Sequence, residues 1–433
     1  MATAELQRSA TETGGLRRLR SILGGSAGNL VEWYDWYAYS AFALYFAGVF
    51  FPKGDQTAQL LNAAAVFAVG FLARPVGAWL MGRYADRRGR KASLTLSVAL
   101  MCAGSLIIAF CPGYASIGVA APVILTLARL VQGLSLGGEY GTSSTYLSEM
   151  AGRDRRGFWS SFQYMTLISG QLTALGVLLV LQAILPKAEL QAWGWRVPFV
   201  IGGLLAVSVF WLRRGIDETD SYKAVESKER GRTHWLWLRH PKESLTVIGL
   251  TAGGTLSFYT FTIYAQKFLA NTAGFSKEQA SQISAAALLV MMLIQPVVGA
   301  ISDKVGRRPV LIAFGVLGTL FTWPILRALG GASDPMAAFF LLVAALGITS
   351  GYTAVNAVVK AEMFPTEIRA LGVALPYAIA NALFGGTAEY VALWFKQAGH
   401  ETWFYGYVTG MIALSLLVYV GMRDTKKHSR IME

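Results

Sequence analysis

Twelve long apolar runs, each close to the length of a membrane span, divide this chain from near its start to near its end. They lie near residues 22–50, 58–82, 93–112, 120–147, 158–185, 196–213, 243–268, 280–302, 309–329, 335–359, 371–397 and 402–422. A helix that crosses the hydrocarbon core needs roughly 20 apolar residues. Because the runs lack the alternation of a transmembrane barrel, the sequence predicts an all-α membrane protein with twelve spans.

The composition agrees with this prediction and excludes several other classes of protein. Hydrophobic residues make up 54% of the chain and charged residues 15%, whereas soluble domains average about 25% charged residues. The chain is therefore too apolar for a soluble enzyme, a disordered segment or a nucleic-acid binder. No metal site, phosphate loop or nucleophile–base pair is recognisable, so we expect a transporter rather than a membrane-embedded enzyme, and a channel is the third option. We expect no cofactor and no metal.

Positive residues are distributed unevenly between the two sides of the membrane. If both termini lie on one side, that side holds 29 of the 38 Lys and Arg residues, the other holds seven, and two lie inside spans. The positive-inside rule then predicts that both termini are cytoplasmic. The net charge of +13 is mainly an orientation signal, so we expect membrane lipid but no nucleic acid as a partner, and we take the protein to be a monomer.

The chain repeats itself at a fixed offset. The loop Gly82–Lys91 after the second run matches Gly299–Arg308 after the eighth at five anchor positions, 217 residues apart. Six spans per repeat is an even number, so both halves insert in the same orientation, as in parallel-repeat transporters. We therefore expect a cytoplasmic tail (1–21), a six-helix bundle (22–213), a cytoplasmic linker (214–242), a second six-helix bundle (243–422) and a cytoplasmic tail (423–433).

Six ionisable residues inside the runs are candidates for function, because a charge at this depth costs at least a few kcal/mol. They are Glu32, Asp35, Glu139, Glu389, Arg74 and Arg129. Four acids against two arginines is unfavourable in a low dielectric, so we expect one or two acids to be protonated at rest. Glu32 and Asp35 share one helical stripe and suit a proton carrier. The alternative is that they pair with loop arginines near the cytoplasmic end.

Arg74 is predicted to lie near the middle of the membrane. It precedes Gly82 by eight residues, which places it about 12 Å from the cytoplasmic end of its helix at 1.5 Å per residue. Its guanidinium can bind a carboxylate with two parallel hydrogen bonds. Arg74 is therefore a candidate ligand for a substrate carboxylate. The alternative is a structural pair with Glu32, Asp35 or Glu139.

The fourth run combines small and charged residues. Gly133 and the glycines at 137 and 141 recur every fourth residue, which lets a neighbouring helix approach closely. Arg129 and Tyr140 share roughly one stripe, with Glu139 beside it. We favour a charge relay between Arg129 and the acids of the first run over a purely structural role.

The second half carries polar and aromatic residues at positions predicted to lie within spans. They are Tyr259, Tyr264, Lys267, Gln295, Asn356, Tyr377, Asn381 and Glu389. A single tyrosine is more often a packing residue, but a set spread over several runs is more consistent with the lining of a polar cavity. We expect Lys267 and Lys360 to lie close to the membrane interfaces, with their ammonium groups reaching toward water.

These motifs resemble a known superfamily. The two repeated loops resemble the signature loop of the major facilitator superfamily, and Arg129-x-x-Gln132-Gly133 resembles a motif of its fourth span. Asn29–Asp35, Arg74-Pro75, Gly137–Glu139 and Glu362–Pro365 resemble the metabolite:proton symporter family within it. Further stretches are similar to the α-ketoglutarate carriers of that family: Leu134–Thr142, Trp193–Pro198, Phe258–Phe261, Lys360–Pro365 and Phe384–Tyr390. The resemblance covers about residues 22–420.

The resemblance implies a twelve-helix major facilitator fold and import of α-ketoglutarate with protons across the inner membrane by alternating access. The alternative is proton symport of another organic acid, such as citrate, another dicarboxylate or an aromatic acid. We expect proton coupling by Glu32, Asp35, Arg129 and Glu139, and gating by Asp86, Arg90, Asp303 and Arg307. We expect substrate binding by Arg74, Tyr140, Tyr259, Tyr264, Lys267, Gln295, Asn356, Tyr377, Asn381 and Glu389.

Overall fold

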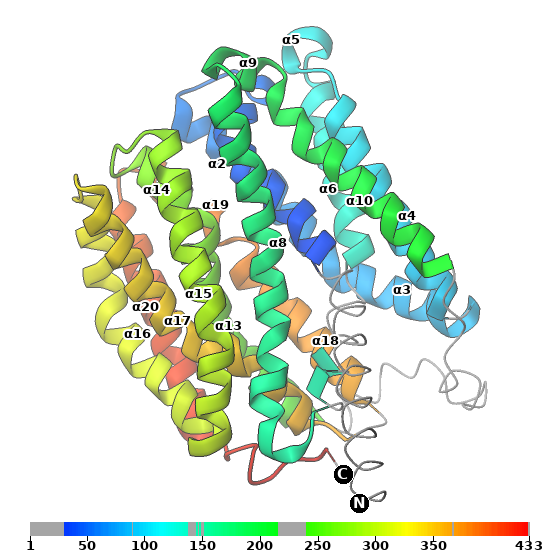
Figure 1. Ribbon diagram of the computed structural model, residues 1–433, viewed down its shortest axis with the longest axis vertical. Helices are drawn as coiled ribbons and strands as arrows, with labels where there is room; N and C mark the ends of the chain where they lie inside the picture. Colours follow the sequence, from blue (N-terminus) through cyan, green and yellow to red (C-terminus); the bar gives the residue numbers. More distant parts are fainter. Residues whose placement is uncertain are drawn as a thin grey trace, which may run out of the picture.

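Long helices lie side by side and build most of the described molecule (Figure 1). The computed structural model describes residues 30–88, 90–136, 144–145, 147–148, 151–214, 240–365 and 368–431, apart from a few side chains. Helices of the first half of the chain gather on one side and those of the second half on the other, and α8 and α15 pack together where the two groups meet. We call the end of the bundle that carries the C-terminal tail the inner end, and we call the end that carries α5 and α9 the outer end.

The first half begins with a helix over residues 30–50, and its second span is broken. The later helices are α2 (Gln56–Leu72), α3 (Arg74–Arg88), α4 (Arg90–Phe110), α5 (Tyr114–Ile117), α6 (Ala120–Leu136), α8 (Arg156–Ile184), α9 (Lys187–Ala192) and α10 (Val197–Arg214). Helix α2 ends just before Arg74 because Pro75 has no amide hydrogen to continue the helical ladder. The break places Arg74 at the first position of α3, at the junction of the two segments.

The second half contains two helices interrupted by π turns. Its elements are α13 (Pro241–Tyr259), the π turn η3 (Thr260–Tyr264), α14 (Ala265–Asn271), α15 (Lys277–Val305), α16 (Arg307–Gly330), α17 (Pro335–Met363), α18 (Arg369–Ala380), the π turn η4 (Asn381–Gly385), α19 (Ala388–Gln397) and α20 (Glu401–Gly421). A π turn adds one residue to a helical turn and is frequent at functional sites. Both turns border residues predicted to bind substrate.

The predicted spans agree with the helices. Seven segments are long and apolar enough to cross a membrane by length and composition: Gln56–Met81, Arg156–Ile184, Lys277–Val305, Arg307–Gly330, Pro335–Met363, Leu371–Gln397 and Glu401–Gly421. Three shorter apolar helices, Thr95–Phe110, Ala120–Ser135 and Gly194–Ser208, fall on three further predicted runs. Some helices begin before the predicted apolar run, because a capping motif stabilises an earlier first turn. Helix α15 starts at Lys277 because Ser276 and Gln279 form a reciprocal capping box.

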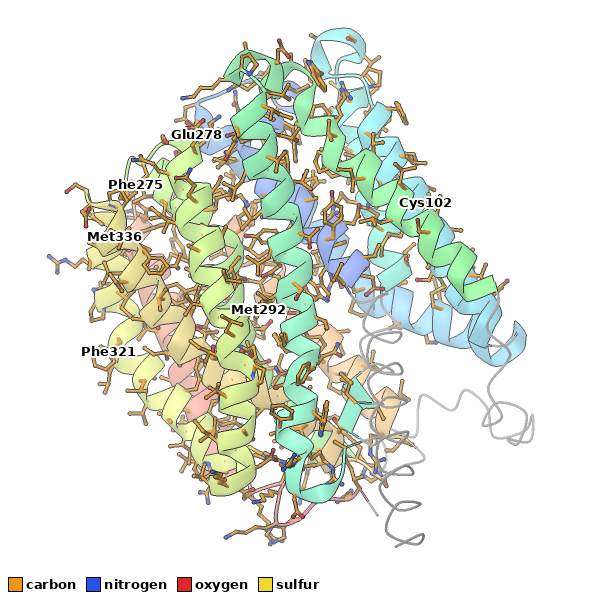
Figure 2. The ribbon with its side chains drawn as sticks, in the orientation of Figure 1. Cys102, Phe275, Glu278, Met292, Phe321 and Met336 are labelled. Carbon is orange, nitrogen blue, oxygen red and sulfur yellow. The ribbon has the colours of Figure 1, made fainter. Side chains whose placement is uncertain are left out.

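Large apolar side chains on the outside of the bundle fit a lipid environment. Phe321 and Met336 lie at the edge of the bundle and point away from it (Figure 2), and they are 46% and 58% exposed. Apolar surface of this kind is costly in water, whereas lipid tails solvate it.

Glycines bring α2 and α6 into close contact. A Cβ added at Gly133 would meet the carbonyl oxygen of Gly70 and would lie 3.1 Å from the Cβ of Ala73. A Cβ added at Gly70 would lie 2.9 Å from the Trp36 ring and 3.2 Å from the carbonyl oxygen of Arg129. The prediction of close helix approach at Gly133 is therefore confirmed, whereas Gly137 and Gly141 lie outside the described residues.

We expect Gly133→Ala to destabilise the protein, because overpacking a tight contact typically costs about 1–3 kcal/mol. Gly176→Ala on α8 is the matched control, since a Cβ there meets no atom within 4 Å. Replacing a helical glycine by alanine at an open site gains up to about 1 kcal/mol. Thermal unfolding in detergent, followed by tryptophan fluorescence, measures both variants. Equal melting temperatures for the two variants would contradict the packing described here.

Candidate functional site

The carboxylate of Asp35 is held by side chains from two neighbouring helices. Its Oδ2 accepts a hydrogen bond from Gln132 Nε2 of α6 at 2.6 Å, and its Oδ1 accepts one from the Ser105 hydroxyl of α4. Gln132 Oε1 in turn accepts a hydrogen bond from Arg129 Nη1 at 2.8 Å. All four side chains are buried. The structure therefore joins Arg129 to Asp35 through the amide of Gln132, and not through a direct ion pair.

Aromatic rings cover the buried guanidinium of Arg129. Its central carbon lies 3.8 Å from the ring centre of Trp36, 4.5 Å from that of Tyr39 and 5.5 Å from that of Phe67. A desolvated cation gains about 2 kcal/mol from such a face. The rings therefore offset part of the cost of burying this charge.

The same indole ring also contacts the second buried arginine. The guanidinium carbon of Arg74 lies 4.3 Å from the ring centre of Trp36, 3.9 Å from that of Phe71 and 5.4 Å from that of Trp33. Trp36 is thus shared by Arg74 and Arg129. Glu32, buried on the same helix as Trp36, interacts electrostatically with Arg74.

Polar residues of the second half meet Arg74 at the two π turns. The guanidinium of Arg74 lies beside Tyr259 and interacts with Tyr377. Asn381 Nδ2 donates a hydrogen bond to the Tyr259 hydroxyl at 3.4 Å, and Asn381 Oδ1 accepts one from Thr255 at 2.6 Å. Tyr259 directly precedes η3 and Asn381 begins η4. The structure therefore brings four predicted substrate-binding residues together across the two halves.

Lys360 joins this group from α17, whereas the sequence predicts that its ammonium group reaches toward water. Its side chain is fully buried, and Nζ donates a hydrogen bond to Asn356 Oδ1 at 2.7 Å. Nζ also lies 3.8 Å from the ring centre of Tyr377. Because the protein buries this ammonium group, the prediction that it reaches toward water is wrong. The spacing of four residues from Asn356 on one helix face was the available signal.

Lys267 and Glu389 form a second buried group between the halves. Lys267 Nζ lies 3.0 Å from Glu389 Oε2 and hydrogen-bonds to Ser40 of the first half, which also donates to Glu389 at 3.3 Å. Both charged side chains are almost completely buried. The expectation that the Lys267 ammonium group reaches toward water is therefore wrong as well. These two predicted substrate ligands bind one another.

Two other predicted ligands are used in packing within the second half. Gln295 donates a hydrogen bond to Ser350 at 3.0 Å and accepts one from Thr353 at 2.8 Å, which joins α15 to α17. Tyr264 packs its ring against Phe268 and Phe404. These contacts of Gln295 and Tyr264 stay within the second half and do not reach Arg74.

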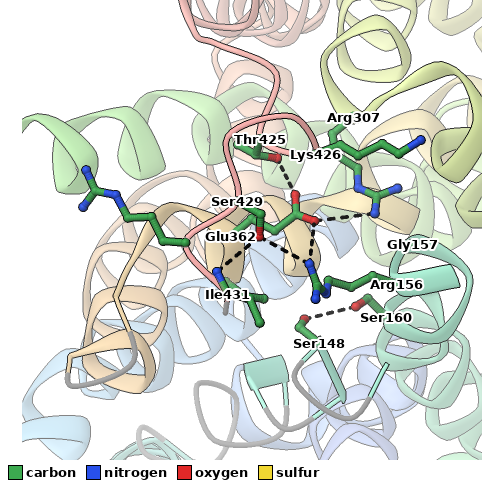
Figure 3. Close-up of polar contacts among 12 residues, drawn as sticks. Ser148, Arg156, Gly157, Ser160, Arg307, Glu362, Thr425, Lys426, Ser429 and Ile431 are labelled. Carbon is green, nitrogen blue, oxygen red and sulfur yellow. Dashed lines mark hydrogen bonds and ion pairs between the residues drawn. The ribbon is translucent and has the colours of Figure 1, made fainter. Parts of the chain in front are cut away.

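Ion pairs join the two halves at the inner end (Figure 3). Arg156 Nη1 of α8 lies 3.8 Å from Glu362 Oε1 of α17, and Arg307 Nη2 lies 3.5 Å from the same oxygen. Arg307 also pairs with Asp303 at 2.8 Å. The carboxylate of Asp303 accepts hydrogen bonds from the backbone amides of Gly157 and Phe158 at 2.7 and 2.8 Å, a favourable site for an anion at a helix N-terminus.

The structure places Asp303 and Arg307, both predicted to act in gating, in this inner network. The side chains of their counterparts in the first half, Asp86 and Arg90, lie outside the described residues, as do Glu139 and Tyr140.

The sequence also matches known proteins. Residues 22–243 and 214–431 each match the family described as "Sugar (and other) transporter". The chain belongs to this family. The α-ketoglutarate permease of Escherichia coli (strain K12) is 54% identical to this transporter over 429 residues, with 99% of each chain covered. The citrate-proton symporter of Klebsiella pneumoniae is 33% identical, with 89% of this chain and 86% of the relative covered.

A solved structure confirms the fold of this transporter. The crystal structure of a D-xylose-proton symporter matches 94% of this chain and 98% of its own with a TM-score of 0.74, at 19% identity. A second structure of a major facilitator superfamily proton:xylose symporter gives a TM-score of 0.76 at 18% identity. The predicted major facilitator fold, with twelve transmembrane helices in two repeats, is therefore confirmed.

The buried ion pair between Lys267 and Glu389 is expected to matter for the stability of this transporter. Lys267→Met should lower the melting temperature by several degrees, because removing one partner of a buried ion pair costs about 3–5 kcal/mol. The double variant Lys267→Met/Glu389→Gln should recover much of this loss, since it buries no uncompensated charge. Lys187→Met is the control, because Lys187 pairs with Glu278 at 3.7 Å on the surface, where ion pairs contribute little. A double variant less stable than Lys267→Met would contradict this account.

Proposed function

We propose that this transporter imports α-ketoglutarate with protons across the inner membrane by alternating access, with both termini in the cytoplasm. The observation that carries the proposal is the Trp36 ring, which contacts both a candidate substrate ligand, Arg74, and a candidate proton relay, Arg129. The 54% identity to an α-ketoglutarate permease supports the choice of substrate. The names of the citrate-proton and xylose-proton symporters support coupling to protons.

Arg74 is the proposed ligand for a substrate carboxylate. Its planar fork suits bidentate binding of a carboxylate. The Tyr259 hydroxyl and the Asn381 amide beside it offer hydrogen bonds to the keto oxygen. Since Arg74 belongs to the first half and the other two to the second, bound substrate would hold the two halves together around itself.

Asp35 is the proposed proton carrier. A protonated Asp35 loses its charge while Ser105 and Gln132 remain close enough for hydrogen bonds. Binding of an anion at Arg74 changes the electric field at Arg129, which shares the Trp36 ring. Gln132 passes that change to Asp35, because its amide contacts both Arg129 and Asp35. Glu32, which interacts with Arg74, is the second candidate carrier.

The charge of the substrate explains the need for protons. α-Ketoglutarate is a dianion at neutral pH, and an inside-negative potential opposes its entry by about 2.3 kcal/mol per charge per 100 mV. Two protons would make the step electroneutral. Two buried acids near the arginine pair are enough for this stoichiometry.

Contacts between the halves at both ends are the proposed gates. At the outer end, Lys277 Nζ of the second half donates a hydrogen bond to the carbonyl oxygen of Leu44 at 2.6 Å. At the inner end, Asp303 binds the start of α8. Rocking of the two halves would break one set of contacts at a time, which is the requirement for alternating access.

Uptake into proteoliposomes tests the proposal. We expect a pH gradient, acid outside, to drive accumulation of labelled α-ketoglutarate, and unlabelled α-ketoglutarate to compete better than citrate, succinate or shikimate. Citrate is the second candidate substrate because a citrate-proton symporter is 33% identical. Stronger competition by citrate would move the assignment to that acid.

The variant Asp35→Asn tests the coupling in the same vesicles. We expect it to exchange internal for external substrate but to lose accumulation driven by the pH gradient, because an amide cannot carry the proton. Asp334→Asn is the matched control, since Asp334 caps α17 by accepting from the amide of Ala337 and asparagine caps equally well. Unchanged accumulation by Asp35→Asn would remove Asp35 from the coupling.

A further inference from the structure

Two buried cations approach one tyrosine from opposite halves of the protein. Lys360 Nζ, on α17 of the second half, lies 3.8 Å from the ring centre of Tyr377. Arg74, on α3 of the first half, interacts electrostatically with the same tyrosine. One aromatic side chain therefore lies next to both charges.

The surroundings of these cations provide further hydrogen-bonding groups. The hydroxyl of Tyr259 lies beside Arg74, and Asn356 holds the Lys360 ammonium at 2.7 Å. Lysine and arginine within spans are rare and mark substrate or ion pathways. The arginine offers a planar fork and the lysine a compact point charge, so the two sites suit two anionic groups of one small molecule.

We propose that Lys360 binds the second carboxylate of the substrate and thereby selects dicarboxylates over monocarboxylates. This inference rests on the proposed function, in which Arg74 binds the first carboxylate. Each half of the transporter then holds one end of the substrate. A monocarboxylate occupies Arg74 alone and leaves the second half without its anionic ligand.

Competition between two matched acids tests this assignment. α-Ketovalerate has the carbon chain of α-ketoglutarate but only one carboxylate. We expect Lys360→Met to weaken binding of α-ketoglutarate about tenfold or more, as for loss of a charged hydrogen bond, and to leave that of α-ketovalerate unchanged. Lys360→Arg should keep the preference for the dicarboxylate. Lys304→Met, which removes an exposed charge from α15, is the control.

The result separates this inference from the proposed function. If the wild-type protein takes up no α-ketoglutarate, the proposed function fails. If it does, but Lys360→Met keeps the wild-type ratio of the two affinities, only the role of Lys360 fails. An equal loss for both acids, with a lower melting temperature, would assign Lys360 to the fold and would also overturn the inference.

An independent observation concerns the described C-terminal tail, residues 422–431, which lies across the inner network (Figure 3). The Thr425 hydroxyl donates a hydrogen bond to Glu362 Oε2 at 2.6 Å, and the backbone amide of Arg430 donates to the Glu362 carbonyl oxygen at 2.9 Å. Arg156 Nη1, from the first half, donates to the Ser429 hydroxyl at 3.3 Å. The tail therefore contacts both halves.

The tail is also anchored on the loop between α15 and α16. The carboxylate of Asp424 accepts hydrogen bonds from the backbone amides of Arg307 and Arg308 at 3.4 and 3.2 Å. Lys426 Nζ donates to the carbonyl oxygen of Asp303. Gly306 has a φ of +102°, and a Cβ there would meet the Asp424 carboxylate. The glycine at this turn therefore leaves room for the Asp424 carboxylate to pack against the backbone.

We infer that residues 422–431 form a strap that holds the inner network closed and whose release favours opening at this end. The strap satisfies the second oxygen of Glu362 while Arg156 and Arg307 approach the first. Without the strap, the ion pairs of Glu362 with Arg156 and Arg307 lose the hydrogen bonds that orient them, so the inner end should open more easily.

Hydrogen exchange tests the strap, with the variant Thr425→Val/Ser429→Ala. We expect the amides of Gly157 and Phe158, which bond to Asp303, to exchange about tenfold faster, and substrate exchange across the membrane to speed up. Peptides at the outer end around Leu44 should keep their protection. Lys427→Ala is the control, because Lys427 is exposed in the same tail. A result equal to that of the control, or faster exchange throughout the protein, would overturn the strap.

Discussion

The indole ring of Trp36 contacts two buried arginines of the first half, Arg74 and Arg129. Two guanidinium groups this close repel one another, and each has lost its water. The ring reduces that cost because its π face attracts cations. Through this ring, a site facing the second half is joined to the Gln132–Asp35 network inside the first half. The rest of the proposed mechanism depends on this contact.

Three groups of buried charges in this protein are stabilised in three different ways. At the arginines it uses aromatic faces and an amide bridge. At Lys267 and Glu389 it uses a direct ion pair with a hydroxyl from the opposite half. At the inner end it uses a network in which backbone amides and the C-terminal tail take part. Each solution also links the two halves or their neighbouring helices, so the charges that are hardest to bury are those that connect moving parts.

The sequence was sufficient to predict most of the fold and part of the candidate site. Spans are encoded locally by apolar length, so twelve helical segments and a twofold repeat were predictable. Asp35, Arg74 and Arg129 stood out because charge is rare within spans. Partners were not predictable, because Trp36 and Gln132 are ordinary residues until packing brings them to the arginines. The burial of the Lys360 ammonium group was not predictable for a related reason, because the direction of this long side chain depends on Asn356 and Tyr377.

The π turns η3 and η4 have a consequence for how this sequence can change. Each carries one residue beyond the ordinary α-helical count, and Lys267 and Glu389 lie on the outer side of the two turns. Removing one residue from either turn would restore a regular helix, yet rotate everything beyond it by about 100°. Lys267 or Glu389 would then face away from its partner. A single-residue insertion or deletion in either turn would therefore separate Lys267 from Glu389, and the ion pair depends on both turns.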